Sequence, residues 1–171
     1  MSRKSTVRAD SAFSRLTGQQ QRAWLAYVRV RLRLTYEMNH ELQAASNLSL
    51  PDYDVLNALR YAAGGRMRIT ALAARIGWER SRLSHHARRL QKRGLLECRT
   101  APADRRATEI TLTDHGRDEI TRASGGHIDL VRRLFFDGLP DELLKPLTLG
   151  LESIYENIIE HGTLPAPAGE S

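Results

Sequence analysis

Two helical patterns separated by a glycine and followed by two strand patterns constrain the fold more than any other feature of the chain. A short strand is expected at Ile69, and Thr70 is expected to cap a short helix that Gly77 ends in a tight turn. A second helix is expected from about Glu79 to Arg93. Its inward face repeats at spacings of four and three residues and consists of Leu83, Ala87 and Leu90.

A β-hairpin is expected directly after these helices. Gly94 suits a left-handed helix end, and strand patterns follow at residues 96–100 and 108–112. Residues 101–107 are expected to connect the strands as a charged tip. Two short helices joined by a turn that contains glycine form a helix-turn-helix, and the hairpin adds a wing. The predicted fold class is mainly α with a small β-hairpin wing, a winged helix-turn-helix with a helical dimerisation region.

Longer helices flank this segment. One is expected at residues 19–45, and a shorter one begins near Pro51, buries Leu56, Leu59 and Ala63, and stops at Gly64 and Gly65. Another is expected to run from a Thr113 cap to Phe136, with a bend at Gly125 and Gly126, and the last begins after Leu139. The outer helices carry more apolar surface than a small winged domain covers, so a two-fold homodimer is expected.

Positive charge is concentrated in the winged segment. Between Arg66 and Arg106 the chain has twelve basic and three acidic residues, a net charge of +9, whereas the whole chain carries +6. A short segment of this kind suits the phosphate backbone of double-stranded DNA.

The outward face of the second helix is the predicted site of DNA contact. Residues near a recognition helix's start usually contact bases and later ones contact the backbone. The expected base-contacting residues are Ser81, Arg82, Ser84, His85 and His86. Arg88, Arg89 and Lys92 are expected to contact phosphates, while Arg105 and Arg106 at the hairpin tip suit a narrow minor groove.

Other chemistries find little support in the sequence. None of the six histidines stands in a metal-binding spacing, and Ser81 and Ser84 lack the neighbours of a nucleophile, so no metal, no cofactor and no enzymatic activity are expected. The single cysteine, Cys98, is expected to be a buried structural thiol. No apolar run is long enough to span a membrane and the N-terminus lacks a secretory signal, so a cytoplasmic location is expected.

The chain resembles the MarR family of bacterial transcriptional regulators over about residues 19–160. The matching residues are Ile69-Thr70-x-Leu72-Ala73, Ser81-x-Leu83-Ser84, Leu90-x-x-Arg93-Gly94-Leu95, and Asp104-Arg105-Arg106 followed by Leu112-Thr113-x-x-Gly116. The resemblance implies a homodimer formed by the first, fifth and sixth helices, with the recognition helix in the major groove. It also implies that Arg106 enters the minor groove, that Asp104 orients an arginine, and that a small-molecule effector controls DNA binding.

The expected organisation has five parts: a basic extension at 1–18, a dimerisation helix at 19–50, the winged domain at 51–113, dimerisation helices at 114–162 and a tail at 163–171. The expected function is a ligand-responsive repressor that binds a pseudo-palindromic operator as a homodimer. Two alternatives stay open: a non-specific architectural DNA-binding protein, and a helical small-molecule-binding protein without a DNA function. The sequence does not identify the effector. Residues that could line a cleft for it, each equally well explained as core or surface, are Trp24, Tyr36, His40, Tyr53, Arg60 and Tyr61.

Overall fold

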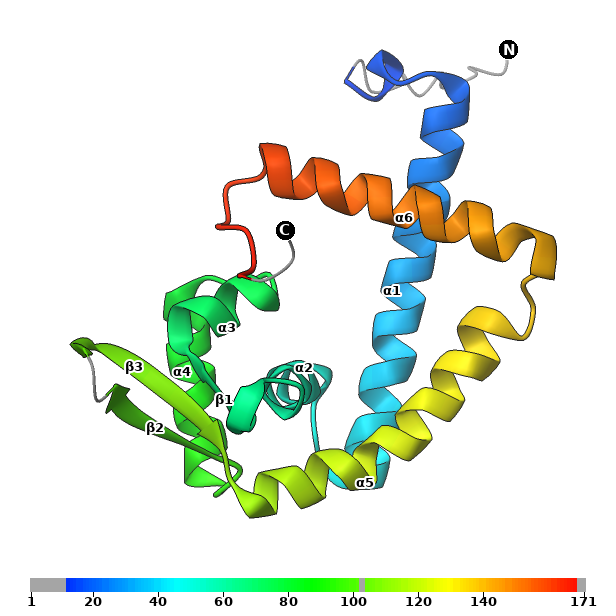
Figure 1. Cartoon of the computed structure of the whole chain (residues 1–171). Helices are drawn as coiled ribbons and strands as arrows, with labels where there is room; N and C mark the ends of the chain where they lie inside the picture. The colour runs from blue at the N-terminus through cyan, green and yellow to red at the C-terminus, as the bar shows by residue number, and fades with distance from the viewer. Residues whose placement is uncertain (1–11, 102–103, 169–171) are drawn as a thin grey trace, which may run out of the picture. The chain divides into compact units, whose positions relative to one another are not determined.

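The computed structural model describes residues 12–101 and 104–168, with the backbone but not the side chains of residues 104–106 (Figure 1). The α-helices are α1 (Gly18–Ser46), α2 (Leu50–Arg60), α3 (Ile69–Arg75), α4 (Arg80–Lys92), α5 (Asp114–Val131) and α6 (Asp141–His161). The strands are β1 (Arg66–Arg68), β2 (Leu96–Ala101) and β3 (Asp104–Leu112). The predicted fold class is confirmed, because helices dominate and the strands form one small antiparallel sheet.

The chain separates into two units, Met1–Glu37 and Met38–Ser171, and the boundary falls inside α1. In the first unit, the side chain of Gln21 donates hydrogen bonds to the carbonyls of Phe13 and Leu16 at 3.1 and 2.9 Å. These bonds hold a short 3₁₀ turn (Phe13–Arg15) against the start of α1. The predicted helix at residues 19–45 is confirmed, with one further residue at each end.

Helix α2 begins with a reciprocal cap. The Ser49 hydroxyl accepts a hydrogen bond from the Asp52 backbone, and the Asp52 carboxylate accepts one from the Ser49 backbone. Pro51 occupies the first turn, as predicted. Leu56 and Leu59 are fully buried as predicted. The expected burial of Ala63 is wrong, because α2 ends at Arg60 and a turn leaves Ala63 exposed.

The sheet has the order β1-β3-β2, with both pairings antiparallel. Met67 of β1 and Cys98 of β2 lie opposite Ile110 of β3, which is fully buried. The predicted hairpin is confirmed, but β3 begins at Asp104, so residues 104–107 belong to a strand rather than to the connection. Residues 102 and 103 lie outside the described part.

The entry into the helix-turn-helix differs from the prediction by a few residues. The strand lies at Arg66–Arg68, and Ile69 is already the first residue of α3, where it is buried. Thr70 therefore lies inside the helix and Arg68 is its N-cap. The apolar side chain of Ile69 packs into the core from either conformation, so hydrophobicity alone did not separate strand from helix.

One hydrophobic core joins α2, α3, α4, the sheet and the start of α5. Its fully buried side chains include Leu56, Leu72, Leu83, Leu90, Leu96, Ile110 and Ile120. The core fixes one face of α4 and leaves the other exposed.

Helix α5 begins at a Thr113 cap, as predicted, since the Thr113 hydroxyl accepts from the Gly116 backbone at 2.9 Å. The helix continues through Gly125 and Gly126, where a weakened or bent helix is expected from the sequence, without a break in its assignment. A π-helical turn (Arg132–Phe136) follows. A Cβ at Gly126 would lie 2.6 Å from Oε1 of Glu41, the end of a flexible side chain that could move aside.

Candidate nucleic-acid interface

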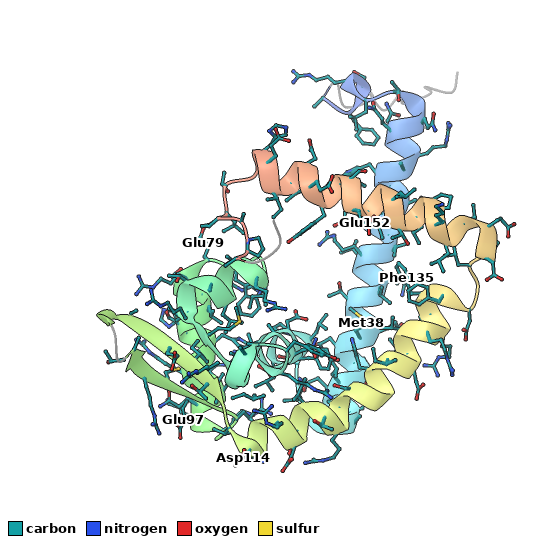
Figure 2. All side chains as sticks on the ribbon, in the orientation of Figure 1. Met38, Glu79, Glu97, Asp114, Phe135 and Glu152 are labelled. Carbon is teal, nitrogen blue, oxygen red and sulfur yellow. The ribbon has the colours of Figure 1, made fainter. Side chains whose placement is uncertain are left out.

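Helix α4 is held by a turn on one side and by its buried stripe on the other. Gly77 has a φ of +68°, a left-handed conformation that glycine adopts without strain. Glu79 stands at the N-cap of α4 (Figure 2). Leu83, Ala87 and Leu90 are buried as predicted. The helix therefore has one fixed orientation on the core.

The opposite face of α4 is polar and exposed. At 100° per residue, Ser81, His85, Arg88 and Lys92 lie within about 50° of the direction opposite the buried stripe. All four are exposed, and none of the four is acidic. Ser84 is half-buried on one flank of this face. A polar, cationic helix face of this width fits the major groove of B-DNA.

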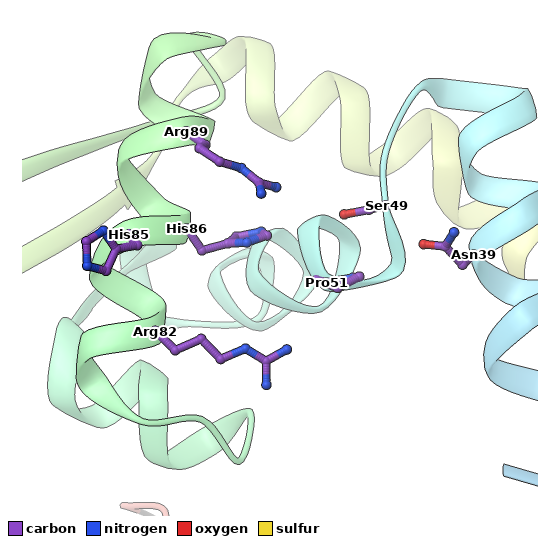
Figure 3. A pocket seen from close by; sticks show the side chains of 7 residues that line it. All are labelled: Asn39, Ser49, Pro51, Arg82, His85, His86 and Arg89. Carbon is purple, nitrogen blue, oxygen red and sulfur yellow. The ribbon is translucent and has the colours of Figure 1, made fainter. Parts of the chain in front are cut away.

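Arg82 lies on the other flank and has an aromatic partner. Its guanidinium carbon is 4.0 Å from the centre of the Trp78 ring, a cation–π geometry. Trp78 is buried in the turn before α4. Figure 3 shows Arg82, His86 and Arg89 extending from α4 toward Ser49 and Pro51, whereas His85 points away from them. Arg82 is thus oriented toward α2 rather than toward the centre of the outward face.

The prediction that His86 lies on the outward face is wrong. His86 is only 9% exposed, its ring stands edge-on to Trp78 at 5.1 Å, and its Nε2 is 2.8 Å from Oδ1 of Asp52. The spacing of apolar residues indicates a buried position, because residue 86 follows Leu83 by three residues and precedes Leu90 by four. The polarity of histidine outweighed the spacing in the prediction.

A groove of about 530 Å³ runs beside this flank (Figure 3). Its lining is polar and rich in cations, and consists of Asn39, Ser49, Pro51, Arg82, His85, His86 and Arg89. The Asn39 side chain accepts a hydrogen bond from the Leu50 backbone at 3.0 Å, which fixes the connection between α1 and α2.

Asp52 is the charged residue that sequence reasoning missed as part of the site. Its carboxylate is buried and contacts His86 and Arg93. Burial by itself would raise the pKa of Asp52, but contacts from His86 and from the backbone and side chain of Ser49 outweigh it and hold the pKa far below its usual value. In the sequence Asp52 follows Pro51 in the first turn of a helix, where an acidic side chain is favourable, and nothing local links it to α4.

The predicted wing residues lie at the start of β3. Asp104, Arg105 and Arg106 are in the strand, and their side chains lie outside the described part.

On the neighbouring strand, β2, Arg99 pairs with Glu97 at 2.6 Å. Cys98 is half-buried rather than fully buried, and burial raises the pKa of its thiol, which keeps it protonated.

Among the described residues, no group of three or more histidine, cysteine, aspartate or glutamate side chains is arranged to hold a metal ion. Within the same residues, no helix combines the length and the apolar character that crossing a membrane requires.

Helices α3 and α4, the glycine turn between them and the β2–β3 hairpin define a winged helix-turn-helix protein. A sequence model of the MarR family matches residues 46–107. The structure of AbsC, a MarR family transcriptional regulator from Streptomyces coelicolor, is similar with 34% identity and a TM-score of 0.79, covering 84% of this chain and 96% of AbsC. The chain therefore belongs to the MarR family of transcriptional regulators.

Two further solved structures are similar over most of the chain. Sco3205, a MarR family transcriptional regulator from Streptomyces coelicolor in complex with DNA, has 32% identity and a TM-score of 0.82, covering 88% of this chain and 98% of that one. CouR from Rhodococcus jostii RHA1, bound to p-coumaroyl-CoA, has 25% identity and a TM-score of 0.67, covering 85% and 95%. No curated protein sequence matches the chain significantly.

Proposed function

We propose that the protein is a homodimeric repressor that binds a pseudo-palindromic operator and leaves it when a small molecule binds. The observation that carries the proposal is the outward face of α4, where Ser81, His85, Arg88 and Lys92 are exposed opposite a fully buried stripe. A helix that is fixed on its core and polar on its free face can enter the major groove without rearrangement. Similarity to Sco3205, solved with DNA, supports the same function.

The proposed contacts divide by position. Ser81, Ser84 and His85, in the first half of α4, contact base edges, and Arg88 with Lys92 contacts phosphates. Arg82 and Arg89, on the flank of α4 that faces α2, contact the sugar–phosphate backbone of the adjoining DNA strand. Arg105 and Arg106 contact the minor groove from the hairpin, and Asp104 orients one of these arginines.

Exposed apolar surface supports the homodimer. Helix α6 has no buried residue within the described chain, and its exposed side chains include Leu143, Leu144, Leu151, Ile154, Tyr155 and Ile158. In the first unit, Trp24, Leu25, Tyr27, Val30 and Leu32 are exposed on α1. A second copy would cover such faces across a two-fold axis. We therefore assign residues 19–50 and 114–162 to dimerisation and 51–113 to DNA binding.

A small-molecule effector is proposed by analogy with CouR, which was solved with p-coumaroyl-CoA bound. An effector that binds the free dimer better than the DNA-bound dimer shifts the population away from the operator. A thermal-shift screen of small organic acids and thioesters would identify candidates.

The test is selection of duplexes from a random library, followed by gel-shift measurements against the selected site and against the DNA flanking the gene. We expect a sequence with two half-sites about 34–36 Å apart, since a two-fold dimer presents two recognition helices at that spacing. We expect the selected site to bind at least about a thousandfold more tightly than random duplex at moderate salt. Equal binding to both duplexes would favour an architectural protein and contradict the proposal.

A further inference from the structure

Asp52 contacts side chains from three positions of α4 or its end. Its Oδ1 is 2.8 Å from Nε2 of His86 and 3.6 Å from Nη2 of Arg89, and its Oδ2 is 3.0 Å from Nη1 of Arg93. The Asp52 residue is only 3% exposed. These contacts join α2 to α4 through one buried carboxylate.

The carboxylate is itself held in place. Its Oδ2 accepts a hydrogen bond from the Ser49 backbone at 3.0 Å, within the cap that begins α2. Arg93 has a second anchor, because its Nη2 donates to the carbonyl of Asn47 at 2.8 Å. Together these contacts form a tether between α2 and α4 that starts from a fixed carboxylate; its buried members are Asp52 and His86, while the side chains of Arg89 and Arg93 are 67% and 36% exposed.

The spacing of the three partners determines what the tether restrains. Residues 86, 89 and 93 follow one another by three and four positions, so they lie along one side of α4 over two turns. A single contact would leave the helix free to rotate about it, whereas contacts over two turns restrain both the rotation of α4 and its position along its axis.

We propose that Asp52 is a positioning residue for DNA recognition, which sets the angle at which α4 presents Ser81, His85 and Arg88 to the bases. The inference rests on the proposed function, since it assigns a role within DNA reading by α4. Asp52 itself is buried behind the helix and contacts no DNA.

The charge of Asp52 makes positioning distinguishable from electrostatics. A negative charge near the DNA-binding face weakens binding to any duplex, so its removal alone should tighten binding to operator and random DNA alike. Loss of positioning should instead lower the affinity for the operator relative to random duplex, because only the operator requires aligned base contacts.

The experiment compares Asp52→Asn with Asp54→Asn in the full-length protein. Both substitutions remove one negative charge from α2 when the assay is run at pH 8, because burial raises the pKa of Asp54 to about 6 and the nearby Arg82 and His86 oppose this only in part. The readout is the ratio of the Kd for random duplex to the Kd for the operator at one fixed salt concentration. We expect Asp52→Asn to lower this ratio by about tenfold, the equivalent of one lost base contact, and Asp54→Asn to leave it within about twofold.

A second pair of variants covers the case in which Asp52→Asn fails to fold. His86→Gln keeps an amide donor that can reach the carboxylate, whereas His86→Leu removes the donor at similar volume. We expect His86→Gln to retain most of the operator preference and His86→Leu to lose it, with both folded by circular dichroism at the assay temperature. An equal preference for operator over random duplex in His86→Gln and His86→Leu would overturn the proposal.

Different results would contradict the proposed function and the positioning role of Asp52. If the wild-type protein binds operator and random duplex equally, the proposed function fails and this inference fails with it. If the wild-type protein discriminates and Asp52→Asn discriminates equally well, only the positioning role of Asp52 is overturned.

Discussion

Gly116 occupies a position where a side chain has no room. A Cβ there would overlap the carbonyl oxygen of Leu95 and lie 2.9 Å from Cδ1 of Leu112. The first turn of α5 thus lies directly against the base of the hairpin. This close approach gives a physical reason for the glycine in the Leu112-Thr113-x-x-Gly116 pattern.

Replacing Gly116 by alanine should lower the free energy of unfolding by about 1–3 kcal/mol, because backbone must move to admit the methyl group. Urea denaturation at fixed protein concentration measures the effect. Gly125→Ala is the matched control, since a Cβ at Gly125 meets nothing within 4 Å among the described residues. It should raise stability by up to about 1 kcal/mol through helix propensity. Equal effects of the two substitutions would contradict this account.

His127 is a buried titratable residue of α5. Its ring centre lies 4.3 Å from that of Tyr53, and only 8% of the residue is exposed. Burial lowers the pKa of His127, and the nearby Glu41 carboxylate opposes this only in part. The folded protein therefore holds this imidazole neutral at pH 7.

A lowered histidine pKa means that the unfolded chain binds the proton more tightly. The contribution of His127 to the free energy of unfolding should thus fall as pH decreases below about 6.5, the ordinary histidine pKa, and should continue to fall through the lower folded pKa. Burial raises the pKa of Asp54 to about 6, so Asp54 contributes in the opposite direction over part of this range. His127→Gln should remove the histidine contribution from the stability–pH curve. Urea denaturation between pH 5 and pH 8 would measure it, and identical slopes in the wild type and His127→Gln would count against the assignment.

At the scale of the element, the proposed contacts of α4 divide along the helix, with base contacts in its first half and phosphate contacts in its second half. Arg88 lies on the exposed face beyond the base-reading first half, where a recognition helix meets phosphates. A phosphate contact carries affinity without sequence preference.

Arg88→Ala should weaken binding to operator and random duplex by similar factors. The slope of log K against log salt should become shallower by about one, since one released counterion is lost. Arg122→Ala on α5 removes the same charge from an exposed position and should change neither quantity much. A loss confined to the operator would instead make Arg88 a base-contacting residue.

The helices of the winged helix-turn-helix could be predicted where the spacing of apolar residues and the positions of the glycines that end helices agreed. Leu83, Ala87 and Leu90 set the period of α4, and Gly77 and Gly94, both at positive φ, mark the turn before it and its end. The errors arose where tertiary contacts decide. His86 is inward because Asp52 and Trp78 give it partners that no local pattern reveals. The helix continues through Gly125 and Gly126 because a helical glycine lowers propensity without preventing a helix.

At the scale of the whole molecule, the exposed apolar side chains of α6 need a partner surface. Ile154 is 59% exposed on this helix, and Glu156 lies on its polar face. Burial of each such side chain across a dimer contributes about 1.5–3 kcal/mol when it is complete.

Ile154→Glu should therefore convert the proposed dimer to monomer, because a carboxylate would be desolvated in an apolar interface. Sedimentation velocity measures the change, and operator affinity should fall with it because the two half-sites are then bound independently. Glu156→Lys, a larger change of charge on the same helix, should leave the dimer intact. A dimeric Ile154→Glu protein would rule out α6 as the interface.

The base of the hairpin also limits which changes of length the gene can accept. The Thr113 hydroxyl donates to the Gly94 carbonyl at 2.7 Å, and the Thr113 backbone donates to Leu95 at 3.3 Å. The end of α4, the start of β2 and the start of α5 thus meet at two consecutive peptide groups. An insertion or deletion of a single residue between Gly94 and Leu96, or between Leu112 and Gly116, would shift all three elements out of register at once. Functional variants should therefore vary in length elsewhere and keep these two short stretches at constant length.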